Sequence, residues 1–76
     1  MEDIFTTRFR EALEQSGMKQ QELADKTHLS KQCISDFKIG RAYPSIQTLR
    51  TLCVALDVSS DYLLGLEDES GTKKYR

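Results

Sequence analysis

The sequence is short of the residues that build metal sites, disulfide frameworks and membrane spans. Of 76 residues, one is histidine, one proline and two cysteine, and none is tryptophan. Cys33, Cys53 and His28 do not form a close-spaced ligand set, and a small secreted domain usually needs more cysteines, so two free thiols are expected. No apolar run approaches the roughly 20 residues of a membrane helix, and the acidic start, Met1-Glu2-Asp3, lacks the layout of a signal peptide. We therefore expect a cytoplasmic protein with no metal, no cofactor and no membrane contact.

The chain also lacks an overall basic excess. Eleven Lys and Arg stand against twelve Asp and Glu, a formal net charge of −1, whereas nucleic-acid-binding domains are typically basic. The distribution is uneven, since residues 18–43 carry five basic and three acidic side chains and residues 1–17 have a net charge of −2. The central segment is thus modestly positive, although a solvated charged surface explains this almost as well.

Catalytic motifs are absent as well. No glycine-rich phosphate loop follows a strand, and no close-spaced set of His, Cys or carboxylates is found. The run Glu67-Asp68-Glu69 lies in a polar segment, where burial cannot raise a carboxyl pKa. The sequence therefore does not predict an enzyme.

Helical periodicity dominates and predicts an all-α domain. We expect a compact five-helix domain over residues 1–66 and a polar, flexible tail over 67–76. The helices are predicted at about 4–15, 20–27, 31–39, 45–57 and 60–65. Gly17 and Gly40 end the first and third helices, Ser30 and Pro44-Ser45 begin the third and fourth, and Ser59 or Ser60 caps the fifth. Their apolar stripes are Phe5, Phe9, Ala12 and Leu13; Leu23 and Ala24; Ile34 and Phe37; Leu49, Leu52, Cys53 and Leu56; and Tyr62, Leu63 and Leu64.

Residues 27–30 separate the second and third helices by only a short turn. Two short helices joined in this way pack at a steep angle, and the outer face of the second one projects from the domain. An α-helix with an apolar inner face and a polar outer face fits the major groove of DNA. In residues 31–39, Ile34 and Phe37 point inward. The polar residues on the other side are Lys31, Gln32, Ser35 and Asp36.

These residues resemble the helix-turn-helix of the phage repressor/Cro (XRE) family. The resemblance rests on Gln20-Gln21-Glu22-Leu23-Ala24, Leu29-Ser30, Ile34, Phe37 and Gly40, and it continues through Pro44-Ser45-Ile46, Leu49, Leu52-Cys53, Leu56-Asp57-Val58-Ser59 and Asp61-Tyr62-Leu63-Leu64. It covers about residues 5–66. It implies a bacterial or phage regulator associated with the nucleoid, more often a repressor, that binds a palindromic double-stranded DNA operator as a homodimer.

The resemblance also implies roles for single residues. Base contacts are expected from Lys31, Gln32, Ser35 and Asp36. Contacts to the DNA backbone are expected from Arg10, Gln20, Ser30, Lys38, Arg41 and Tyr43. A dimer seam is expected at Tyr62, Leu63 and Leu66, with packing inside one chain as the alternative.

Several of these assignments have a simpler structural alternative. Ser30 can act only as an N-cap, and Gln20 can be a solvated side chain. Lys31 can donate to guanine or neutralise a phosphate, and Asp36 can accept from cytosine N4 or repel wrong sequences. Cys33, beside the reading face, is interpreted as a plain small residue rather than a redox group.

Two positions depart from the family. His28 occupies a turn position where glycine is usual, and Ile39 stands where a polar residue is common. Together with the acidic balance, they leave a second function open: a protein-interaction module, such as an antitoxin or an anti-repressor target, with weak DNA affinity.

Overall fold

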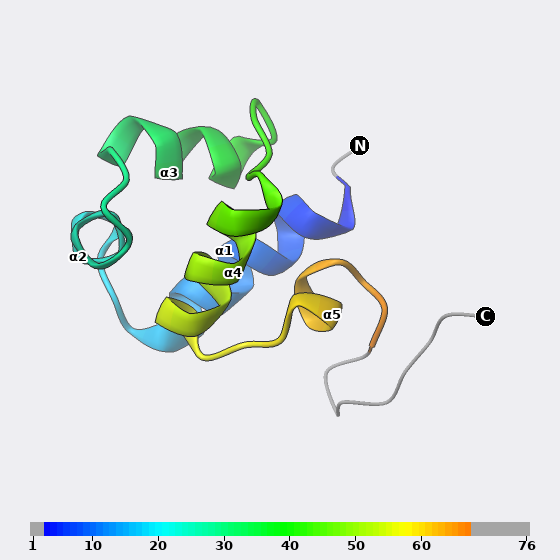
Figure 1. The fold of residues 1–76 in the computed structure, drawn as a ribbon. Helices are drawn as coiled ribbons and strands as arrows, with labels where there is room; N and C mark the ends of the chain where they lie inside the picture. The colour runs from blue at the N-terminus through cyan, green and yellow to red at the C-terminus, as the bar shows by residue number, and fades with distance from the viewer. Residues whose placement is uncertain (1–2, 68–76) are drawn as a thin grey trace.

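The computed structural model describes residues 3–67, and these form a bundle of five helices (Figure 1). The helices are α1 (Ile4–Ser16), α2 (Gln20–Thr27), α3 (Lys31–Ile39), α4 (Ile46–Leu56) and α5 (Ser60–Leu63). The predicted all-α fold and the order of its helices are confirmed. The fifth helix is shorter than predicted, because Gly65 takes a left-handed φ of 78° just after it. The predicted tail lies outside the described residues except for Glu67.

α3, α4 and α5 each begin after a serine cap that the sequence indicates. The Ser30 hydroxyl accepts from the Cys33 amide at 3.0 Å, and the Ser45 hydroxyl accepts from the Thr48 amide at 3.2 Å. Ser59, rather than Ser60, caps α5. These hydroxyls bind amide groups of the first turn that have no partner inside the helix, and each cap is typically worth about 1 kcal/mol. The predicted caps of α3 and α4 are therefore confirmed.

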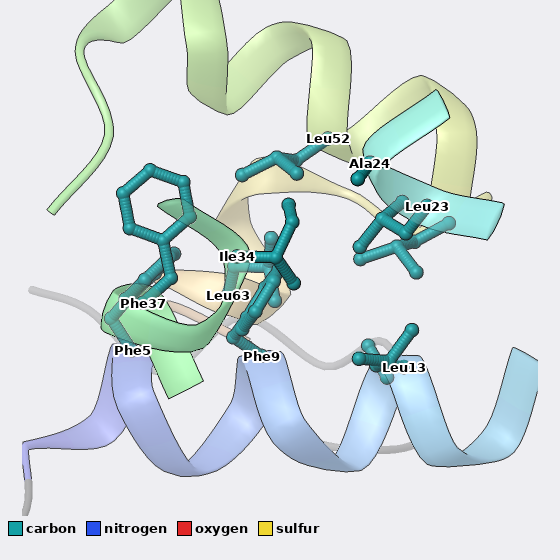
Figure 2. Packing of buried hydrophobic residues seen from close by; sticks show 11 residues of the cluster. Phe5, Phe9, Leu13, Leu23, Ala24, Ile34, Phe37, Leu52 and Leu63 are labelled. Atoms are coloured by element: carbon teal, nitrogen blue, oxygen red, sulfur yellow. The ribbon is translucent and has the colours of Figure 1, made fainter. Parts of the chain in front are cut away.

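The core lies between α1 and the other four helices. Phe5 and Phe9 point from α1 toward Phe37 and Ile34 of α3, and Leu13 points toward Leu23 of α2 (Figure 2). The rings of Phe9 and Phe37 meet edge to face, with centroids 6.0 Å apart, an arrangement that aromatic pairs favour. Complete burial of side chains of this size stabilises a fold by about 1.5–3 kcal/mol each. This packing holds α3 against α1.

Leu63, which the sequence placed at a dimer seam or inside the chain, belongs to the core. Its side chain is fully buried, so it offers no surface to a partner subunit. Tyr62 and Leu66 are half-buried, and for them the dimer seam stays a prediction. The sequence could not separate these neighbours, because a four-residue helix has too few turns to show which side faces inward.

The packing leaves α3 at the edge of the domain. α1 packs against α3, α4 and α5, while α2 packs against α3 and α4. In Figure 1, α3 runs along one side of the molecule with the other helices beneath it. Among residues 3–67, no helix combines the length and the apolar character that crossing a membrane requires.

His28 occupies a backbone conformation that favours glycine. It ends α2 with φ 58° and ψ 31°, in the left-handed region. A side chain there costs roughly 1–2 kcal/mol, because Cβ approaches the following carbonyl oxygen. Histidine is among the residues that tolerate this conformation better than most, which explains how it replaces the usual glycine without loss of the turn.

Replacing His28 by glycine is expected to stabilise the protein. Removing Cβ relieves the left-handed strain, and part of the gain is lost to the larger chain entropy of glycine in the unfolded state. We expect the free energy of unfolding to rise by about 0.5–1 kcal/mol, measured by urea unfolding. Lys26→Gly, two residues earlier on an exposed right-handed position, should instead lower it by about 1 kcal/mol. A loss of stability in both variants would contradict the strain argument.

Candidate nucleic-acid interface

The turn between α2 and α3 is fixed by short-range hydrogen bonds. The buried Thr27 hydroxyl donates to the Leu23 carbonyl at 2.7 Å, and the Leu29 amide donates to the Ala24 carbonyl at 3.0 Å. Ser30 then caps α3. In Figure 1, α2 is seen nearly end-on and α3 from the side, so the two helices run in clearly different directions. This arrangement is a helix-turn-helix.

α3 has an apolar inner face and a polar outer face. Ile34 and Phe37 are buried in the core. Lys31 and Gln32 are exposed, and Ser35 and Asp36 are half-exposed. The structure thus brings the four predicted base-contact residues to the surface of one helix. Their contact with DNA stays a prediction.

A network of polar side chains joins α1, the start of α2 and both ends of α3. The Gln20 amide donates to the Lys31 carbonyl at 3.0 Å and accepts from the Lys38 ammonium at 3.2 Å. The Arg10 guanidinium donates to the Lys38 carbonyl at 2.7 Å. Arg10 and Gln20, both predicted to contact the DNA backbone, therefore each bond to Lys38, which carries the same prediction, and these bonds fix α3 relative to α1 and α2.

These three residues border an open hollow of about 350 Å³. It is lined by Arg10, Leu13, Glu14, Met18, Gln20 and Lys38. Two cations and one amide face this space, together with the single carboxylate of Glu14. The local charge is therefore positive, although the whole chain is slightly acidic.

Comparisons with known proteins agree with this geometry. A helix-turn-helix family profile matches residues 9–63. The chain belongs to the helix-turn-helix family. It is 34% identical over 61 residues to YonR, a SPbeta prophage-derived uncharacterized HTH-type transcriptional regulator of Bacillus subtilis. The aligned residues are 80% of this chain and 56% of YonR. It is 30% identical over 73 residues to the uncharacterized HTH-type transcriptional regulator YqaE, and 33% identical over 63 residues to the HTH-type transcriptional regulator ImmR, both of the same bacterium.

The match is with one part of these relatives. It covers 96% of this chain and 61% of YqaE, and 83% of this chain and 50% of ImmR. The chain thus spans between half and two thirds of the length of the relatives that it matches. The resemblance to repressor/Cro-type helix-turn-helix proteins is confirmed at the level of the family.

The loop after α3 of this helix-turn-helix protein is tied to the start of α1. The Tyr43 hydroxyl donates to a carboxylate oxygen of Asp3, and the Tyr43 ring meets Phe5 edge-on at 6.1 Å between centroids. Asp3 also caps α1 by accepting from the Thr6 amide at 2.9 Å. Arg41, predicted to contact the DNA backbone, is exposed in the same loop.

These hydrogen bonds shift the pKa values of both partners. The bond from Tyr43, followed by that from the Thr6 amide, lowers the pKa of Asp3 below its usual 3.8. The same bond to Asp3 raises the pKa of Tyr43 above its usual 10.0. The ionised carboxylate and the neutral phenol are thus the forms that the contact favours. The sequence indicated the loop residue Tyr43 but not its partner Asp3, forty positions away.

A second contact that the sequence did not predict involves Arg8 of α1. Its guanidinium donates to the carbonyls of Tyr62 and Glu67, at 2.9 and 2.6 Å, and lies 4.5 Å from the centroid of the Tyr62 ring. The Tyr62 hydroxyl donates to Glu11 at 3.3 Å. Tyr62, predicted at a dimer seam, is therefore also held within its own chain by α1.

The described part of the chain has no cluster of three His, Cys, Asp or Glu side chains arranged to hold a metal ion. Cys33 and Cys53 are both free thiols and half-buried. Burial raises the pKa of Cys53, which keeps it in the unreactive thiol form. The two cysteines are thus not joined to each other by a disulfide.

Tyr43→Phe is expected to raise the pKa of Asp3 toward 3.8, because it removes the hydroxyl that favours the ionised carboxylate. A carboxyl with a lowered folded pKa adds stability above its unfolded pKa and loses it as the pH falls through the folded value. The part of the stability that Asp3 adds above its unfolded pKa, and that is lost on acidification, should therefore be smaller in the variant. NMR titration of the Asp3 carboxyl measures the shift directly. Tyr62→Phe is the control and should leave the Asp3 titration as it is; an unchanged Asp3 pKa in Tyr43→Phe would contradict the assignment.

Proposed function

We propose that this protein binds double-stranded DNA sequence-specifically and regulates transcription, with α3 in the major groove. The observation that carries the proposal is the structure of α3 itself. Its inner face is buried in the core, its N-terminus is capped by Ser30, and its outer face is polar. A helix held in this way presents hydrogen-bonding side chains to base edges with little freedom to be lost on binding.

Recognition of the bases is assigned to the surface of α3 that Lys31, Gln32, Ser35 and Asp36 form. Lys31 and Gln32 lie in the first turn of α3 and are exposed, and in helix-turn-helix proteins the N-terminal residues of the second helix meet the bases. A glutamine amide donates and accepts side by side, which matches adenine N7 and N6. Gln32 is therefore the residue that we assign to adenine.

Backbone contacts are assigned to the groups around α3. Arg10, Gln20 and Lys38 surround the hollow beside α3, and Arg41 and Tyr43 follow it in the next loop. Cations in these places neutralise phosphates and set the register of the protein on the duplex. Ser30 adds its backbone amide while its hydroxyl stays on the cap.

The operator is proposed to be palindromic and the protein a homodimer. Two copies of α3 about 34 Å apart would enter successive major grooves on one side of the duplex. Tyr62 and Leu66 form the proposed seam, next to Leu64, which is 45% exposed. A dimer that covers promoter DNA excludes polymerase, which favours repression over activation.

The test is selection of binding sites from a randomised duplex library, followed by fluorescence anisotropy with the selected site and a scrambled duplex. Binding to the selected site should be tighter and should weaken steeply between 50 and 200 mM salt, because bound phosphates release counterions. A selected motif with two inverted half-sites supports the dimer, and a single half-site contradicts it. Equal, weak binding to both duplexes would overturn the proposed function.

Gln32→Ala is expected to relax the base preference at one position of each half-site. The loss should be about 1–3 kcal/mol for the preferred base and much less for scrambled DNA. Gln21→Ala is the matched control, because Gln21 donates to Asp25 at 2.9 Å just as Gln32 donates to Asp36 at 2.9 Å, but from α2. Any effect of Gln21 should be equal for all sequences. Equal weakening of Gln32→Ala on both duplexes would exclude a role in readout.

Lys38→Ala is expected to weaken binding to every duplex by a similar factor. It removes one candidate phosphate contact, so the slope of log affinity against log salt should become shallower by about 1. Lys26→Ala removes the same charge from the side of α2 that faces Ala55 of α4, and should leave the slope unchanged. If Lys38→Ala changes base preference instead, Lys38 contacts bases rather than phosphates.

A further inference from the structure

Gln32 and Asp36 are hydrogen-bonded to each other on the outer face of α3. The Gln32 amide nitrogen donates to an oxygen of Asp36 at 2.9 Å. The residues are four positions apart and so lie one above the other on the same side of the helix. An ionised carboxylate only accepts hydrogen bonds, so the amide must turn an N–H group, not its oxygen, toward Asp36. Asp36 therefore fixes which way the Gln32 amide faces.

This pairing limits what Gln32 can offer to a base. A free glutamine amide has two N–H groups and one carbonyl oxygen. With one N–H bound to Asp36, one donor and one acceptor remain. Adenine presents an acceptor at N7 and a donor at N6, whereas guanine presents two acceptors, N7 and O6. The remaining pair matches adenine, and the second N–H that guanine requires is already in use.

We propose that Asp36 is a positioning residue that makes Gln32 select adenine over guanine, acting through Gln32 and not by its own contact with a base. This rests on the proposed DNA-binding function and extends it to the determinant of specificity. The exposures of the two side chains fit these roles. Gln32 is exposed at the end of α3 that enters the groove, while Asp36 is half-buried one turn farther along.

The pairing also accounts for a carboxylate on a helix that approaches DNA. A free carboxylate there is repelled by the phosphates and weakens binding to every sequence. A carboxylate hydrogen-bonded to Gln32 is still charged, but its effect on affinity depends on the base, because it orients the Gln32 amide that contacts the base. A purely repulsive role and a positioning role therefore predict different results for the same substitution.

The experiment compares the affinities for two duplexes. One is the selected site, and the other has guanine in place of adenine at the position where Gln32→Ala relaxes the base preference. The ratio of the two affinities is the readout. Asp36→Ala should lower this ratio by about tenfold, within the range expected for a bidentate base contact. Asp36→Asn should retain most of it, because its side-chain oxygen still accepts from Gln32. In a Gln32→Ala background, Asp36→Ala should have no further effect on the ratio.

Asp25→Ala is the matched control, since it breaks the equivalent pair with Gln21 on α2, and it should leave the ratio unchanged. Thermal unfolding of each variant checks that the fold is retained. The proposal is overturned if Asp36→Ala leaves the ratio unchanged, if it only raises affinity for all duplexes, or if its effect persists without Gln32, as direct readout of cytosine by Asp36 requires. Failure of the DNA-binding function itself is distinguishable, because the wild-type protein would then prefer no duplex.

Discussion

The contact between α1 and the inner face of α3 is the interaction on which the rest of the domain depends. Phe9 and Phe37 meet edge to face, and Ile34 is fully buried beside them. A nine-residue helix is too short to be stable alone in water, so its conformation comes from this packing. The buried side chains thus determine the position of every polar group on the opposite face. The function proposed for that face rests on the core.

Hydrogen bonds from polar side chains, together with the apolar contact, fix the position of α3. Packing against α1 alone leaves α3 free to slide or turn by small amounts, whereas the hydrogen bonds from Arg10 and Gln20 to its backbone carbonyls fix both of its ends. These are also the groups proposed to lie near phosphates. One N–H of a guanidinium or an amide can hold the helix while another faces the DNA. The structural role and the proposed binding role therefore fall on the same side chains.

The helices and caps could be predicted from the sequence because their signals are local. The stripe of Phe5, Phe9 and Leu13 repeats with the helical period, and Ser30 and Ser45 cap the amides that follow within three residues. The outward face of α3 followed from the same periodicity. The end of α5 was predicted less well, because a helix of four residues shows no period.

The remaining contacts could not be predicted, because they join distant parts of the chain. Arg8 reaches carbonyls 54 and 59 positions away, and Tyr43 reaches a carboxylate 40 positions away. Nothing in the sequence near either residue indicates its partner. The pairing of Gln32 with Asp36 has the opposite character. Its spacing of four was visible in the sequence, but whether two neighbouring polar side chains bond to each other depends on their rotamers, which the sequence pattern does not specify.

The net charge of −1 does not describe the surface around α3, because some of the carboxylates are hydrogen-bonded within the chain. Asp3 accepts hydrogen bonds from Tyr43 and Thr6, and Asp36 accepts one from Gln32. These two carboxylates therefore stabilise contacts within the chain. Over residues 31–41, the cations Lys31, Lys38 and Arg41 outnumber the single acid Asp36. A domain with so few cations gains little affinity from phosphates alone. If the proposed function holds, its affinity for random DNA is expected to be low, and a larger share of binding must come from base contacts. A slightly acidic chain with a positive reading helix is therefore consistent with a DNA-binding protein that depends on specificity more than on charge.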